Sequence, residues 1–325
     1  MKLRTVFAAL AGLASLAGAL PSVQAQGYPS RPIRIIAQFQ PGTSTDILAR
    51  VIGARLTDAW GQQVVVDNRP GAGGLVGTEL GAKAAPDGYT LTMAVSSGFG
   101  INPTLYAKLP YDVLRDFAPI TNIALTPQTL VVNPGFGAKS VKDLVALARS
   151  KPGQINYASL GAGSTSHLTM EMFRSAAGIT LNHIPYKGSP AAHAELFSGQ
   201  IAVMFDAIPA ILPHVKSGRL HGLGIGSAQR SPFLPDVATI AESGFPGFEA
   251  VGWIGIAAPS RTPPAVLDKL NSEIRRIINT AEMKERLATL AFTPVGDSRD
   301  EFTRFIKSEI ARWGKAVRES GAKAE

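Results

Sequence analysis

The chain has 325 residues, a formal net charge of +8 at pH 7 and no cysteine. Without cysteine it has no disulfide, no thiolate metal site, no cysteine nucleophile and no N-terminal cysteine for lipid attachment. Its lysines and arginines are scattered rather than clustered, so nucleic acid is not an expected partner, although a basic protein attracts small anions.

The first 25 residues have the pattern of a secretory signal peptide. Lys2 and Arg4 precede an apolar run over residues 6–20, and the small residue Ala25 stands at the expected cleavage point. A membrane anchor is the alternative, but the run is shorter than the roughly 20 apolar residues that a spanning helix needs. We therefore predict an exported, periplasmic protein of 300 residues and charge +6, long enough for two ordinary domains or one large one.

Strand-like and helix-like stretches alternate along the rest of the chain. In residues 46–60, Leu48, Ile52, Leu56 and Trp60 keep the four-residue spacing of one buried helix face. Apolar runs typical of strands lie at 33–39, 63–67, 90–95, 129–133, 156–159, 201–205, 220–225 and 253–257. The alternation predicts an α/β fold with largely parallel sheets, and residues 265–325 are expected to be almost wholly helical.

Two of these strands lead into turns of the same design. Residues 41–46 read Pro-Gly-Thr-Ser-Thr-Asp and residues 161–166 read Gly-Ala-Gly-Ser-Thr-Ser, and an amphipathic helix follows each. A helix start presents unpaired N–H groups and a partial positive charge, so two facing starts form a cradle for a small anion. Neither turn contains lysine or arginine, which favours recognition by backbone and hydroxyl groups and argues against a nucleotide triphosphate.

Helix capping alone is the simpler explanation of each turn, since serine and threonine are favoured wherever helices begin. Ligands in open α/β sheets, however, lie at the carboxyl ends of strands, where both turns are found. The occurrence of the pattern twice favours ligand contact more strongly than either turn does alone.

A third glycine cluster, residues 68–74, follows another strand and invites a dinucleotide-binding interpretation. The spacing does not fit, because Val76 occupies the place of the third glycine and no acidic residue ends a second strand about 20 residues later. A loop that packs closely against a helix is the expected role. Arg69 is either a solvated or structural residue or an anion contact.

Asp206 ends the apolar run 201–205, so its carboxylate either faces the ligand cleft or caps the next helix near Ile208 and Pro209. His167, at a helix start, is expected to be neutral and structural, or else to line the cleft. The five histidines show no metal-ligand spacing such as HExxH, and the chain lacks a G-x-S-x-G elbow, an S-x-x-K motif and a Walker lysine. We therefore expect no metal, no cofactor and no enzymatic activity.

Several longer motifs together resemble one family. They are Pro41-Gly42 with residues 46–50 (Asp-Ile-Leu-Ala-Arg), residues 68–74 (Asn-Arg-Pro-Gly-Ala-Gly-Gly), residues 86–91 (Pro-Asp-Gly-Tyr-Thr-Leu), Ser166-His167-Leu168 and residues 185–188 (Pro-Tyr-Lys-Gly). The chain resembles, over essentially all of its predicted mature length, the substrate-binding proteins of tripartite tricarboxylate transporters, the Bug family of bacterial periplasms.

The resemblance implies a two-lobed periplasmic-binding-protein clamshell of the type II kind, with the ligand cleft between the lobes. We expect lobe I to comprise residues 26–124 and 249–325, and lobe II residues 125–248, with crossings near 120–126 and 248–253. The family's ligand, usually a small carboxylate, is held mainly by main-chain groups, hydroxyls and waters. The resemblance carries binding roles onto Phe39, Gly42, Thr43, Ser44, Thr45, Asp46, Gly161, Gly163, Ser164, Thr165, Ser166 and Asp206.

The chain departs from the family pattern at three places. Thr43 stands where a second glycine is common, Leu160 stands where a small residue is usual, and residues 193–196 (His-Ala-Glu-Leu) replace a stretch that usually carries aspartate. These changes bear on which ligand is bound rather than on the fold.

The expected function is capture of a small organic carboxylate by a monomeric protein that delivers it to membrane permease subunits. One alternative is a ligand-presenting subunit for a sensor kinase, and another, of a different class, is a secreted carboxylic ester hydrolase. The sequence leaves open aromatic acids, aliphatic dicarboxylates, amino acids and nicotinate-like compounds as ligands.

Overall fold

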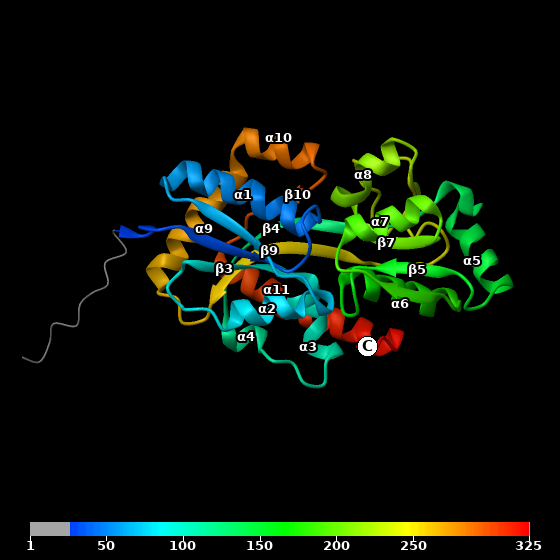
Figure 1. The fold of residues 1–325 in the computed structure, drawn as a ribbon, viewed down its shortest axis with the longest axis horizontal. Helices are drawn as coiled ribbons and strands as arrows, with labels where there is room; N and C mark the ends of the chain where they lie inside the picture. Colours follow the sequence, from blue (N-terminus) through cyan, green and yellow to red (C-terminus); the bar gives the residue numbers. More distant parts are fainter. Residues whose placement is uncertain (1–26, 325) are drawn as a thin grey trace, which may run out of the picture.

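The computed structural model describes residues 27–324. The predicted signal peptide, with its cleavage after Ala25, lies outside this part of the chain. The fold is α/β, as predicted, and Figure 1 shows two groups of strands and helices side by side, joined by long central strands. The strands follow the order β2-β1-β3-β9-β4-β7-β5-β6, with β8 and β10 pairing to β4.

The first group contains most of the N-terminal part of the chain. Its strands are β1 (Ile33–Ala37), β2 (Val64–Asn68), β3 (Thr90–Val95) and β9 (Val251–Pro259). β1 is parallel to β2 and β3, whereas β9 runs antiparallel to β3. The helices are α1 (Ser44–Trp60), α2 (Leu75–Ala82), α4 (Val113–Asp116), α9 (Pro264–Asn279) and α10 (Ala281–Thr289). The face of α1 predicted from its four-residue spacing is buried at Leu48, Ile52 and Leu56 in the core of this group.

The second group contains the middle of the chain. Its strands β5 (Asn156–Ser159), β6 (Asn182–Pro185) and β7 (Val203–Ala207) are parallel, and β8 (His221–Ile225) is antiparallel to β4. The helices are α5 (Val141–Ser150), α6 (Thr165–Ala177), α7 (Ser189–Ser198) and α8 (Ile208–Lys216). β5, β6 and β7 each lead into a helix, so these helix starts gather at the carboxyl ends of the parallel strands.

One 16-residue strand, β4 (Phe117–Val132), connects the two groups. It pairs antiparallel with β9 as far as Pro127 and Val251, and from Gln128 onward it pairs antiparallel with β7. The sheet is therefore mixed, and the expectation of largely parallel sheets holds only within each group. The chain crosses between the groups inside continuous strands, and the lobe boundaries given above remain a prediction.

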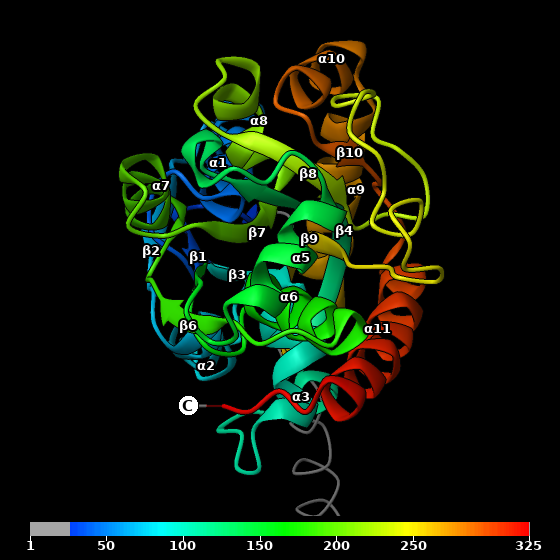
Figure 2. The ribbon, with the colours of Figure 1, turned by 90° about the vertical axis from the view of Figure 1, so that its right-hand side faces the viewer.

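The last helix, α11 (Arg299–Ser320), packs against both groups. Phe302 and Ile306 lie in an aromatic core of the first group, while Trp313 and Val317 lie in the core of the second group. Figure 2 shows the helix along one flank of the molecule, past α6. The C-terminal part is mainly helical, as predicted, but the two-residue strand β10 (Thr293–Pro294) interrupts it.

Candidate ligand-binding site

A small cavity of about 50 Å³ lies where the two groups of elements meet. The starts of α1 and α6, the end of β3 and the crossing strands β4 and β9 surround it. It is lined by Phe39, Thr43, Ser44, Thr45, Val95, Ser96, Ser97, Thr126, Gln128, Leu160, Ser164, Thr165, Ser166, Asp206, Ala207, Trp253 and Ile254. The structure thus brings the two predicted turns together across one cavity.

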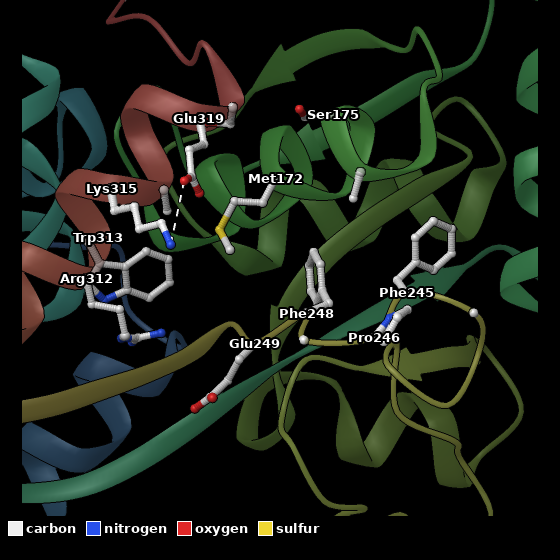
Figure 3. Close-up of a pocket in the computed structure, with 15 residues that line it drawn as sticks. Met172, Ser175, Phe245, Pro246, Phe248, Glu249, Arg312, Trp313, Lys315 and Glu319 are labelled. Atoms are coloured by element: carbon white, nitrogen blue, oxygen red, sulfur yellow. Dashed lines mark ion pairs between the residues drawn. The ribbon is translucent and has the colours of Figure 1, made fainter.

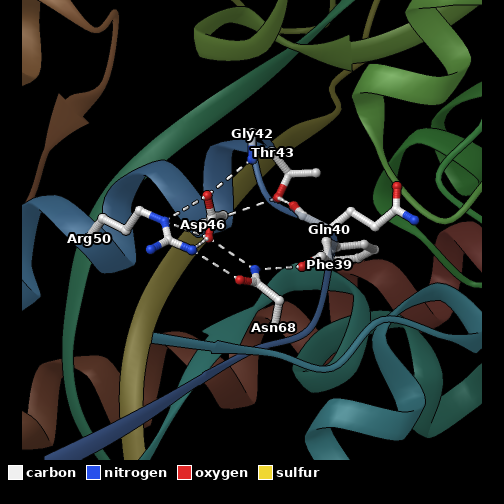
Figure 4. A network of polar contacts seen from close by, with 7 residues as sticks. All are labelled: Phe39, Gln40, Gly42, Thr43, Asp46, Arg50 and Asn68. Carbon is white, nitrogen blue, oxygen red and sulfur yellow. Dashed lines mark hydrogen bonds and ion pairs between the residues drawn. The ribbon is translucent and has the colours of Figure 1, made fainter. Parts of the chain in front are cut away.

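The turn before α1 is held by its own polar groups (Figure 4). The Thr43 hydroxyl donates to the carbonyl of Gln40 and caps the helix at the N–H of Asp46. The Asp46 carboxylate accepts from the N–H of Gly42 at 3.0 Å, from Arg50 at 3.0 Å and from the Asn68 amide at 2.9 Å. Burial opposes ionisation of Asp46, but these hydrogen bonds together outweigh it and hold the pKa of the carboxyl below its ordinary value.

The turn before α6 has the same shape but is held by uncharged groups. The Ser164 hydroxyl caps the helix at the N–H of His167, and the N–H of Gly163 donates to Nδ1 of His167 at 3.3 Å. The Ser166 hydroxyl accepts from the N–H of Leu160 at 2.9 Å. Glycine is required at Gly163, because its φ of 79° lies in the left-handed region.

The groups that remain unpaired around the cavity are hydrogen-bond donors. Each cap satisfies the third N–H of its helix, and within residues 27–324 no protein acceptor pairs with the first two, those of Ser44 and Thr45 in α1 and of Thr165 and Ser166 in α6. The buried hydroxyls of Ser44 and Ser97 also have no partner in the described part of the chain. Buried polar groups are rarely left unpaired, so these donors indicate a site for a polar ligand or ordered water.

The sequence reasoning missed a third strand-to-helix junction. β3 ends at Val95 and passes directly into a buried π-helical turn, Ser96–Ile101, whose first two serines line the cavity. Such turns are frequent at functional sites. The signal is visible in the sequence, because residues 95–98 (Val-Ser-Ser-Gly) repeat the pattern of a strand followed by hydroxyls and glycine.

Asp206 lies in the cavity wall, which favours the first of its two sequence interpretations. It does not cap α8, whose N-terminus has no side-chain cap; instead one oxygen accepts from the N–H of Ala207 at 2.8 Å. The other oxygen is 3.0 Å from Nε2 of His193. Among residues 27–324, Asp206 carries the one charged side chain in the cavity lining.

Four residues predicted for the site do not reach the cavity wall: Gly42, Asp46, Gly161 and Gly163. The Asp46 carboxylate is hydrogen-bonded to Gly42, Arg50 and Asn68, and Asp46 does not line the cavity. This geometry does not provide a direct contact between the carboxylate and a ligand. The three glycines shape the turns, each with a positive φ. The other eight predicted residues line the cavity.

The two groups of elements touch beside both predicted turns. A Cβ placed on Gly73 would lie 2.1 Å from the carbonyl oxygen of Ala162, and one on Gly42 would lie 3.3 Å from Pro190. The glycine cluster at residues 68–74 therefore packs against the turn before α6 rather than against a helix alone. Arg69 pairs with Asp67 at 3.0 Å, which agrees with its structural interpretation.

A larger groove of about 610 Å³ lies elsewhere, between α6, residues 244–249 and α11 (Figure 3). Phe248, Met172 and Trp313 supply apolar surface, and Lys315 and Glu319 pair at 3.6 Å beside it. Neither predicted turn borders this groove. Across residues 27–324 no cluster of histidines and carboxylates is arranged to hold a metal ion, and no described helix has the length and apolar character needed to span a membrane.

A two-lobed α/β fold with a polar cavity between the lobes is the architecture of a periplasmic solute-binding protein, and comparison with known proteins agrees. The model of the tripartite tricarboxylate transporter family receptors matches residues 48–322. The protein BugT of Bordetella pertussis is 41% identical over 319 residues, covering 98% of this chain and 96% of BugT. The chain belongs to the tripartite tricarboxylate transporter receptor family, which confirms the resemblance.

Solved structures give the same result. Rpa4515 of R. palustris, with adipate, has a TM-score of 0.88 and 33% identity, covering 91% of this chain and 99% of that one. MatC from Rhodopseudomonas palustris, with bound malate, has a TM-score of 0.86 and 29% identity, covering 89% and 100%. The two-lobed fold predicted from the sequence is therefore confirmed, and the family is one of binding proteins.

Proposed function

We propose that the chain captures a small organic carboxylate in the cavity between its lobes and delivers it to the membrane permease of a tripartite tricarboxylate-type transporter. The observation that carries this proposal is the set of unpaired donors on the cavity wall: the first N–H groups of α1 and α6 and the hydroxyls of Ser44 and Ser97. Donors at helix starts bind anions without a cationic side chain. The adipate and malate of the two related structures are anions of this class.

The size of the cavity implies movement of the lobes. At about 50 Å³ it has space for roughly four waters, which is less than a dicarboxylate needs. Ligand entry therefore requires the lobes, divided as predicted near residues 124 and 249, to separate along the contacts of Gly73 and Gly42. Closure over the ligand then presents a distinct surface to the membrane partner.

The proposed location is the periplasm, reached through removal of residues 1–25. A sensor kinase in place of a permease would use the same cavity, and capture of the ligand-loaded protein by solubilised membranes separates the two partners. The ester hydrolase is disfavoured by geometry: Ser159 contacts His183 at 2.6 Å, but its hydroxyl also accepts from the N–H of Gly161, it is fully buried, and it does not line the cavity.

The proposal is tested by thermal-shift screening and calorimetry with adipate, malate, an aromatic acid, an amino acid and nicotinate. A ligand at a hundred times its Kd adds about 2.7 kcal/mol to the stability of the folded protein. Ser97→Ala is expected to weaken binding of the responding acid, whereas Ser308→Ala, at an exposed position on α11, leaves it unchanged. Binding of none of these acids, or equal binding by both variants, would contradict the proposal.

A further inference from the structure

A buried imidazole stands behind the one charged side chain of the cavity. His193, in α7, has its Nε2 at 3.0 Å from Oδ2 of Asp206, and the two side chains are only 5% and 4% exposed. The other oxygen of Asp206 is held by the N–H of Ala207. The position of the Asp206 carboxylate is thus fixed from two sides, and one of the two groups that fix it is titratable.

The position of Asp206 raises a problem for an anionic ligand. The cavity is small and buried, and the described residues contribute no basic side chain to its lining. A carboxylate ligand beside an ionised Asp206 would place like charges together where water does not screen them. The helix starts attract the ligand, but the charge of Asp206 opposes that attraction unless it is neutralised.

We propose that His193 is a positioning residue that makes Asp206 compatible with an anionic ligand: Nε2 donates to Asp206, and the imidazole takes up a proton when the carboxylate binds. The ligand then meets a neutral ion pair instead of a bare carboxylate. This inference rests on the proposed function, since it concerns an anion in the same cavity. Because the ion pair neutralises Asp206, the accepted acid needs no cationic group of its own.

The groups that face His193 come from α7, from α8 and from the residues just beyond α8. From α8, the ring of His214 lies 5.2 Å away in an edge contact, and Arg219, just beyond α8, stacks on Phe197 of α7. Burial, followed by the nearby His193 and Arg219, lowers the pKa of His214, while Asp206 acts in the opposite direction. On α7 itself, Glu195 is bonded to the hydroxyl of Tyr186. The lowered pKa disfavours protonation of His214, and the ring in direct contact with Asp206 is His193.

The alternative is that His193 only fills space. It lies close to Phe197 as well as His214, with ring centroids 6.1 Å apart for Phe197, so leucine would then be an adequate replacement. Two substitutions separate these roles. His193→Gln keeps a donor for Asp206 but does not titrate, and His193→Leu removes both properties while remaining apolar and of similar size.

The experiment is calorimetry with malate, and with adipate as a second probe, between pH 6.5 and 8.5 in buffers of different ionisation heats. Wild-type protein is expected to bind at least threefold more weakly at pH 8.5 than at pH 6.5, and to take up a proton on binding. His193→Gln is expected to bind with a flat pH profile and without proton uptake. His193→Leu is expected to bind at least tenfold more weakly at every pH with its helical signal unchanged, while His214→Gln keeps the wild-type profile.

A pH-independent affinity without proton uptake in the wild type would overturn the inference, as would wild-type binding by His193→Leu or loss of the profile in His214→Gln. If neither acid binds, calorimetry uses the acid of the screening panel that does bind; if no acid of the panel binds, the proposed function has failed. A ligand-free measurement still decides this inference. Nitrogen NMR of the imidazole at pH 8 is expected to show the proton on Nε2, with a signal that shifts in Asp206→Asn. A proton on Nδ1 instead would refute the donation to Asp206.

Discussion

The turn before α1 and the turn before α6 correspond residue by residue, yet different chemistry holds each one. Gly42 and Gly163 both have positive φ, Thr43 and Ser164 both cap, and the side chains of Asp46 and His167 both accept from the glycine N–H four residues before them. In the first turn the acceptor is a carboxylate paired with Arg50. In the second it is an imidazole, supported by the serine network around Ser166.

The comparison shows that the two halves of the cavity share their backbone arrangement and not any particular side chain. Both arrangements leave the first two N–H groups of the helix unpaired toward the cavity. A carboxylate places a negative charge near the α1 start, which stabilises the helix but reduces its attraction for an anion. The turn before α6 has no carboxylate at the equivalent position, so the start of α6 lacks this negative charge.

The largest expected effect comes from removing the charged support. Asp46→Ala takes an acceptor from the N–H of Gly42 and from the amide of Asn68, and we expect a loss of about 3 kcal/mol, since a hydrogen bond to a charged group contributes about 1.5–3 kcal/mol. Urea unfolding measures this change. Arg50→Ala is the matched control and is expected to cost less than about 1 kcal/mol, because the Arg50 side chain is 53% exposed. Equal losses in the two variants would show that the ion pair, and not the turn, matters.

The same support is tested by pH. The pKa of Asp46 is lowered in the folded protein from its ordinary value of 3.8, so its contribution to stability is fully present above that value and is lost as the pH falls through the folded-state pKa. The difference in unfolding free energy between wild type and Asp46→Ala is therefore expected to be constant from pH 7 to about pH 5 and to shrink in more acid solution. A difference that stays constant at the acid end would contradict the lowered pKa.

Gly73→Ala tests how closely the turn before α6 is approached from the other lobe. The new Cβ would meet the carbonyl oxygen of Ala162 at 2.1 Å, and the φ of 57° at this position adds strain. We expect at least tenfold weaker ligand binding, about 1.4 kcal/mol, because the lobes no longer close. Gly42→Ala, which meets only the side chain of Pro190, is expected to lose less affinity. Calorimetry compares the two, and tighter binding by Gly73→Ala would exclude closure at this contact.

Ser166→Ala and Thr45→Val change equivalent positions of the two turns and are expected to act differently. Ser166 accepts from the N–H of Leu160, so its loss is expected to cost about 1–2 kcal/mol of stability. Thr45 lines the cavity, so Thr45→Val is expected to leave stability within about 0.5 kcal/mol while weakening ligand binding. Thermal unfolding with and without ligand measures both quantities, and a stability loss in Thr45→Val would reveal an unseen structural role.

The sequence was sufficient to predict the two equivalent turns, because a strand followed by glycine, hydroxyls and a helical pattern is a local signal. The sequence did not distinguish a polar residue that holds such a turn in place from one that contacts the ligand. Asp46 was assigned to the ligand, yet its position on the first turn of α1 directs its carboxylate back to the N–H of Gly42. The pairing of His193 with Asp206 joins α7 to β7. It depends on tertiary packing, which the spacing of residues in the sequence does not indicate.

The fold prediction was least accurate at the long strand β4. β4 was predicted only over residues 129–133, and residues 120–126 were predicted as a crossing between the lobes. In the folded protein Thr121, Asn122 and Thr126 are buried in the strand that joins the two groups. This strand runs antiparallel to its neighbours β9 and β7, which is why the sheet is mixed. The serines of the π-helical turn were missed although residues 95–98 carry the pattern of a strand followed by hydroxyls and glycine, because no long helix follows here as it does after the two predicted turns.

The smallest expected effect distinguishes the two helix caps. The Thr43 hydroxyl accepts from the N–H of Asp46 at 3.5 Å, a long contact, whereas Ser164 accepts from the N–H of His167 at 3.2 Å. Replacing a cap by glycine costs only a few tenths of a kcal/mol, so Thr43→Gly is expected to change stability less than Ser164→Gly does, with the helical signal of both retained. The Thr43 hydroxyl is already bonded within its turn, so what Thr43→Gly removes from the cavity wall is chiefly volume. We therefore expect Thr43→Gly to alter the order of affinities across a panel of acids, favouring larger ones, and an unchanged order in calorimetry would remove Thr43 from the determinants of specificity.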